Sequence, residues 1–179
     1  VDETYENLPL GENNRLIDSH LHHNRVAGAL VSYQKDFIAD GNHLAWNGHE
    51  ADGGTGYGIA ALAGSYNFGV TFQNNTTNHN YRKGLDVHEG NDIVIKDNTA
   101  IGDRLYGIAV YNRQFTMDNV KITGNTIIQD PDFRLDVNDN PRYTYHGYAG
   151  IQVQTNTQFK DLKSADTGYF EISGNTIKN

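Results

Sequence analysis

The stretch that decides the fold is GLDVHEGNDIVIKDNTAIGDRLYGIAVYN, residues 84–112. It holds two apolar strands opened by glycine, GLDVH from Gly84 and GIAVY from Gly107, and between them the segment IVIKDN from Ile93 to Asn98. Apolar residues recur at every second position in each segment, which is the period of a β-strand and not of a helix. A unit with two strand types that repeats along a chain is typical of a solenoid.

The same two patterns alternate from end to end of the chain. The pattern apolar-x-apolar-x-x-Asn occurs, with one poorer copy at the start, as LIDSHL (16–21), FIADGN (37–42), VTFQNN (70–75), IVIKDN (93–98), VKITGN (120–125) and FEISGN (170–175). The strands opened by glycine are GALVS (28–32), GIAAL (58–62), GLDVH (84–88), GIAVY (107–111) and GIQVQ (150–154). Most repeats are 22 to 33 residues long, and the longest interval contains a polar stretch, residues 129–146, that we interpret as an inserted loop.

These repeats predict an all-β fold, a right-handed parallel β-helix of about six coils with two strands in each coil. Asparagines at one position of every coil would form a ladder of side-chain amides along the stack, namely Asn42, Asn75, Asn98, Asn125 and Asn175. The glycine before each second strand would allow a tight turn with positive φ. A β-sandwich with Asn-rich turns is the alternative, but a sandwich gives no reason for two strand types to alternate.

Length and composition limit the function classes. The 179 residues predict one domain spanning residues 1–179, and the chain has no cysteine for disulfides or thiolate metal sites. The net charge of -8 argues against nucleic acid as a partner, and no apolar run is long enough for a membrane helix. The chain begins with Val1 and stops directly after a ladder strand, so we expect it to be a fragment of a longer protein.

Strand alternation predicts a polar surface on the strands opened by glycine. If Leu85 and Val87 point into the core, Asp86 and His88 point outward, and Asp86 lies between the small side chains of Ala60 and Ala109. We therefore expect an exposed groove suited to a sugar polymer, although solvated surface charges would give the same pattern. The candidate catalytic residues are Asp86, His88, Glu89 and Arg104, and the candidate substrate-binding residues are Tyr57, Lys83, Tyr106, Tyr111, Gln152 and Gln154.

Metal sites have weaker support in the sequence. His22 and His23 are adjacent, and adjacent residues of a strand point to opposite faces, which argues against a shared zinc ion. The aspartates Asp130, Asp132, Asp136 and Asp139 leave calcium open as a cofactor, but they lack the spacing of an EF-hand loop, and a solvated loop is favoured. We predict no resident metal ion.

Residues 83–89 resemble the Y-G-F-D-P-H-E segment of bacterial mannuronan C-5-epimerases, which are right-handed parallel β-helices that act on alginate uronates. Asp86, His88 and Glu89 match the motif, whereas Lys83 replaces its tyrosine and Val87 its proline. Arg104, one coil further on, would stand for the arginine of that family. This resemblance implies lyase or epimerase chemistry.

Most of the chain is also similar to the β-helix body of bacteriophage tailspikes and related polysaccharide depolymerases. That resemblance implies a homotrimer, located in a virion tail or outside the cell, that binds and degrades a bacterial surface polysaccharide. Hydrolysis by two carboxyl groups, Asp86 and Glu89, competes with the lyase mechanism. A carbohydrate-binding module without catalysis, or a purely structural segment of an adhesin or tail fibre, stays open as the alternative.

Overall fold

A computed structural model of the chain describes residues 9–49, 55–62, 66–112, 117–133, 149–154 and 168–179. No helix among the described residues is long and apolar enough to cross a membrane. The strands form three long sheets, and every strand pair in them is parallel. The described part of the chain contains no α-helix, in agreement with the sequence prediction.

The three sheets differ in the part of the repeat that they contain. Sheet A consists of β2 (Arg15–Ile17), β6 (Ile38–Asp40), β9 (Thr71–Gln73), β12 (Gly90–Lys96), β15 (Met117–Thr123) and β18 (Phe170–Ser173). Sheet B consists of β3 (His20–His22), β7 (His43–Ala45), β10 (Thr76–Asn78), β13 (Thr99–Ile101), β16 (Thr126–Ile128) and β19 (Thr176–Lys178). Sheet C consists of β4 (Ala27–Val31), β8 (Tyr57–Ala61), β11 (Lys83–His88), β14 (Tyr106–Tyr111) and β17 (Ala149–Gln154), and a short pair joins β1 (Gly11–Glu12) to β5 (Gln34–Lys35).

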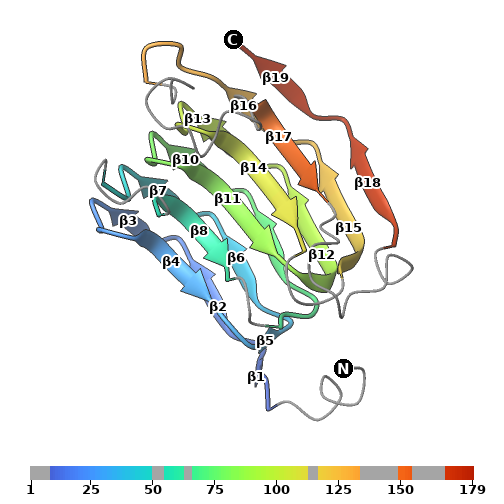
Figure 1. The fold of residues 1–179 in the computed structure, drawn as a ribbon. Helices are drawn as coiled ribbons and strands as arrows, with labels where there is room; N and C mark the ends of the chain where they lie inside the picture. The colour runs from blue at the N-terminus through green and yellow to red at the C-terminus, as the bar shows by residue number, and fades with distance from the viewer. Residues whose placement is uncertain (1–8, 50–54, 63–65, 113–116, 134–148, 155–167) are drawn as a thin grey trace.

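The chain runs through sheets A, B and C in turn and then begins the next coil, so that the colour in Figure 1 changes steadily along the stack. Six coils result, the last of them formed by β18 and β19. The parallel β-helix with about six coils is thus confirmed. The prediction of two strands per coil is wrong, because the chain turns a corner within the Asn repeat and continues as a separate strand of sheet B. At that corner Asp97 has φ 55°, a left-handed conformation that ends β12 before β13 begins.

The predicted asparagine ladder is present at the corner between sheets A and B. The side-chain amide of each ladder residue donates to the amide oxygen of the next at 2.9–3.0 Å, from Asn42 to Asn75, Asn98, Asn125 and Asn175. Asn98 also donates to the backbone carbonyl of Phe72 at 2.9 Å and accepts from the backbone N–H of Asn75 at 2.9 Å. The ladder therefore satisfies buried backbone groups at the corner as well as linking coils.

A second ladder at the corner between sheets B and C was not predicted. Asn24 donates to Asn47, Asn47 to Asn80, and Asn80 to Asp103, at 2.8–2.9 Å. The last position is a carboxyl group, which also accepts a 2.5 Å hydrogen bond from the hydroxyl of Thr77. The second ladder thus ends on a buried ionisable residue.

The glycines that open the strands of sheet C are required for space and not for positive φ, which corrects the sequence prediction. Gly84 is absent from the residues with positive φ. A Cβ at Gly84 would lie 2.3 Å from side-chain oxygens of both Thr77 and Asp103, because the strand passes directly over the second ladder. Only glycine allows this close approach.

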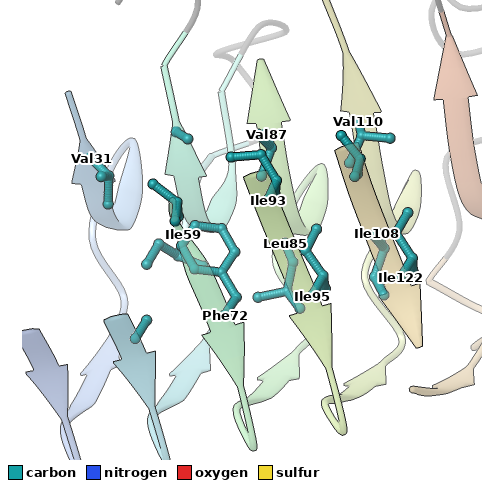
Figure 2. Packing of buried hydrophobic residues seen from close by; sticks show 14 of the residues in the cluster. Val31, Ile59, Phe72, Leu85, Val87, Ile93, Ile95, Ile108, Val110 and Ile122 are labelled. Atoms are coloured by element: carbon teal, nitrogen blue, oxygen red, sulfur yellow. The ribbon is translucent and has the colours of Figure 1, made fainter. Parts of the chain in front are cut away.

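The core fills the space between the sheets with branched apolar side chains. Figure 2 shows Leu85 and Val87 of β11 pointing into the same interior as Ile93 and Ile95 of β12, and all four are fully buried. The predicted inward register of sheet C is therefore confirmed. In the last coils the burial is incomplete: Ile172 is 50% exposed and Val153 is 37% exposed, although both pair in register with core residues.

Candidate functional site

The predicted catalytic strand is β11, and the structure confirms its register but not its exposure. Asp86 pairs with Ala60 and Ala109, as expected, on the face of sheet C opposite Leu85. However, Asp86 is 0% exposed, and Ala60 and Ala109 are buried as well. The side chains of Lys83 and His88 contact the carboxylate of Asp86 on this outer face. The predicted exposed groove along this strand is therefore wrong.

Asp86 is held between two nitrogen donors. Lys83 Nζ lies 2.9 Å from Oδ1, and His88 Nε2 lies 2.6 Å from Oδ2. Burial acts to raise the pKa of Asp86, but the charges of His88 and Lys83 and their hydrogen bonds outweigh it and lower the pKa to about 2. Burial also lowers the pKa of Lys83, and Asp86 opposes that effect in part. The three residues form a buried charge cluster, which we call the Asp86 cluster.

Aromatic rings line the Asp86 cluster. The rings of His88 and Tyr111 lie 4.0 Å apart between centroids, and Lys83 Nζ lies 4.7 Å from the Tyr111 centroid and 5.7 Å from that of Tyr57. His88 uses Nε2 for Asp86, and its other ring nitrogen, Nδ1, is buried without a hydrogen-bond partner. A carboxylate that orients one nitrogen of a histidine and leaves the other unpaired is the arrangement of a general base.

A second group of aromatic and basic residues surrounds a pocket at the corner between sheets B and C. The pocket has a volume of about 340 Å³ and is lined by His23, Asn24, Arg25, Trp46, Gly48, His49 and Tyr81, from three successive coils. Trp46, the single tryptophan of the chain, is 39% exposed there. We call this site the corner pocket.

The indole of Trp46 is supported from one side. It stacks on the ring of His79 with 4.8 Å between centroids and 11° between planes, and the ring of Phe133 packs edge-on against it at 5.4 Å. His79 Nε2 lies 2.8 Å from the carboxylate of Asp130, and Arg104 Nε donates to the backbone carbonyl of Phe133 at 3.2 Å. These contacts fix the indole, so a ligand that stacks on it meets an ordered surface.

Residues 8–177 match a family described as a right-handed beta helix region. The chain belongs to the right-handed β-helix family. The match confirms the handedness that the repeats predicted, and the family fits polysaccharide-binding or polysaccharide-degrading proteins. No curated protein and no solved structure matches the chain.

The fold of this right-handed β-helix divides the predicted catalytic residues between two places. Asp86 and His88 lie together in the Asp86 cluster, but Arg104 belongs to the aromatic group behind the corner pocket, where its guanidinium lies 5.9 Å from the Tyr81 ring centroid. Arg104 precedes β14, whereas His88 ends β11, so the length of a strand separates the two ends of sheet C. Glu89 is fully buried at the corner after β11, with φ 72°.

The predicted binding residues also differ in their surroundings. Tyr57 is 7% exposed and accepts a 3.2 Å hydrogen bond from Arg82, and Tyr106 is 2% exposed and packs with Leu105 and Ala109. Their predicted exposure is therefore wrong, because the outer face of sheet C is buried at these positions. Gln152 and Gln154 are partly buried and hydrogen-bond to each other at 3.2 Å.

Sequence reasoning missed the corner pocket, although the sequence contains a signal for it, the two pairs Trp46-Asn47 and His79-Asn80. Trp46 and His79 each directly precede a residue of the second ladder, and both have positive φ, 54° and 51°. A large aromatic residue in a left-handed conformation is uncommon and stores strain, so such a position is a candidate for a functional role.

The aspartates considered as calcium ligands are only partly described by the structure. The carboxylate of Asp130 contacts His79 and accepts a hydrogen bond from the backbone N–H of Asp132. Residues 136 and 139 lie outside the described residues.

Proposed function

We propose that this right-handed β-helix protein binds a polysaccharide and that the corner pocket is the contact site. The observation that carries the proposal is the exposed, supported indole of Trp46 in a pocket that also contains Tyr81. Aromatic faces pack on the apolar faces of sugar rings. Asn24 and His23, which line the same pocket, supply the hydrogen-bonding groups that hydroxyls require.

The test is binding of the chain to a panel of bacterial surface polysaccharides, measured for the wild type and for Trp46→Asn. Asparagine tolerates the left-handed backbone of position 46, so the variant keeps the fold while it loses the stacking surface. We expect at least about tenfold weaker binding, the usual scale for truncating an interface tryptophan. Tyr169→Ala, which removes an aromatic residue that is 58% exposed outside the pocket, is the matched control and should bind as the wild type does.

Degradation of the bound polymer is the second candidate function, and the unpaired Nδ1 of His88 favours it. In this mechanism His88 removes the C-5 proton of a uronate, the C-4–O bond breaks as the C-4=C-5 double bond forms, and the leaving oxygen takes up a proton from solvent. Asp86 holds the imidazole, and Lys83 supplies positive charge close to it. The nitrogen is buried, so a substrate would have to displace Tyr111, the ring that packs on His88. The burial of the cluster is why we rank binding above degradation.

His88→Asn tests the catalytic proposal. If His88 is the base, turnover should fall at least about 100-fold while polysaccharide binding is retained. Thermal unfolding of the same variant shows whether the fold survives. Unsaturated uronate products would identify a lyase, and new reducing ends without that chromophore a hydrolase using a carboxyl pair. Equal rates for the two proteins would remove His88 from the mechanism.

The assembly and location that the tailspike resemblance implies are parts of the same proposal. A homotrimer in a virion tail or outside the cell would place several corner pockets on one particle, which increases avidity for a repetitive polymer. Light scattering of the purified protein measures its assembly state. A monomer at all concentrations would contradict the trimer.

A further inference from the structure

Four histidines form a continuous group at the end of the stack that carries the first coils. Their rings contact in sequence: His43 stacks on His20 at 4.5 Å between centroids, His20 lies 4.6 Å from His22, and His22 lies 5.2 Å from His23. We call this group the histidine cluster. Three of its members are exposed and His43 is partly buried.

The closest atoms in the histidine cluster are the Nδ1 nitrogens of His22 and His23, which are 2.9 Å apart. His22 is the last residue of β3, and His23 has φ 56°. The left-handed turn at His23 ends the alternation of the strand and brings its ring to the same side as that of His22. The expectation that the two rings point to opposite faces is therefore wrong.

We propose that His22 and His23 bind a divalent transition-metal ion through their Nδ1 atoms. Imidazole nitrogens bind such ions at about 2.0–2.1 Å. Two nitrogens at right angles around an ion are then about 2.9 Å apart, whereas two at the tetrahedral angle are about 3.3–3.4 Å apart. The observed 2.9 Å matches neighbouring positions of a tetragonal ion such as Cu²⁺ or Ni²⁺ better than tetrahedral Zn²⁺.

The remaining positions around the ion would be filled by water. Among the described residues no group of three His, Cys, Asp or Glu side chains converges on one point, so the site is a two-histidine chelate and not a closed structural centre. Both histidines are exposed, and an ion can reach them from solvent. An N–H···N hydrogen bond between the two rings has the same length, so the test must separate it from metal binding.

The test is titration of the untagged protein with CuCl₂ and with NiCl₂, followed by calorimetry and, for copper, by electron paramagnetic resonance. The variants are His22→Thr, which suits the outer face of a strand, and His23→Asn, which suits the left-handed backbone at that position. Tyr33→Asn, which changes an exposed residue with the same left-handed backbone outside both the cluster and the corner pocket, is the matched control.

We expect one ion per chain and a copper spectrum with at least two nitrogen ligands. Each cluster variant should bind the ion at least about tenfold more weakly, because it has lost one of the two ligands. The control should bind copper and nickel as tightly as the wild type. The proposal is overturned if both cluster variants bind within twofold of the wild type, or if the copper spectrum shows no nitrogen pair.

Discussion

Replacing Asp103 by asparagine should stabilise the β-helix above neutral pH and remove a large part of its pH dependence. Asp103 is 4% exposed and occupies the last position of the second ladder, where every other member is an asparagine. Burial raises the pKa of Asp103 from 3.8 to about 7, although hydrogen bonds from Thr77 and Asn80 act to lower it. The unfolded chain therefore releases this proton near pH 4, and the folded chain near pH 7.

The sign and the size follow from this difference. Between about pH 4 and pH 7 the folded state binds the proton and the unfolded state does not, so the free energy of unfolding falls as pH rises. Each pH unit contributes about 1.4 kcal/mol, and the shift of about three units therefore amounts to about 4 kcal/mol above pH 7. Such a loss is a substantial fraction of the stability of a typical domain.

Asparagine at position 103 avoids the loss because it is neutral at every pH. Its oxygen can accept from Asn80 as the carboxylate does, and the Thr77 hydroxyl, which donates to Asp103 at 2.5 Å, can rotate and accept from the new amide. Urea unfolding, approached from both the folded and the unfolded state, measures the effect at pH 4.5, 6 and 7.5. The advantage of Asp103→Asn should grow from about 1 kcal/mol at pH 4.5 to about 4 kcal/mol at pH 7.5.

The matched control is Asp97→Asn, an exposed aspartate that precedes a residue of the first ladder and has the left-handed backbone that asparagine tolerates. Its stability profile should run parallel to that of the wild type. If Asp103→Asn also runs parallel to the wild type, Asp103 titrates alike in the folded and unfolded states and the reasoning is refuted.

Two further changes probe the interior. Asn98→Leu leaves several buried partners of the first ladder without hydrogen bonds. The free energy of unfolding, measured by urea titration, should therefore drop by at least about 3 kcal/mol. A drop under about 1 kcal/mol would show that the ladder is dispensable. Lys83→Met leaves the buried carboxylate of Asp86 with His88 as its single charge partner in the cluster. The free energy of unfolding, measured by thermal unfolding, should therefore fall by about 3–5 kcal/mol. An unchanged midpoint would mean that Lys83 contributes nothing to stabilising that charge.

The sequence alone was sufficient to predict the coil repeat and the first ladder, for a physical reason. Coils of a parallel β-helix stack in register, so a side chain that bonds to its own equivalent must recur at one position, and Asn98 with its equivalents shows this directly. Strand alternation likewise placed Leu85 and Asp86 on opposite faces, because that period is a property of the backbone.

Only the tertiary structure decided what surrounds each side chain. Asp86 points away from the core as predicted, yet it is buried by contacts with Lys83 and His88 that no local pattern specifies. Arg104 lies one coil from Asp86 but in the corner before sheet C, because strand β14 does not begin until Tyr106. The left-handed turns at His23 and Trp46 arise at those corners, and they create the histidine pair and the corner pocket. Alternation describes a strand, and it fails where the backbone leaves the strand, which is where the open pocket of this protein lies.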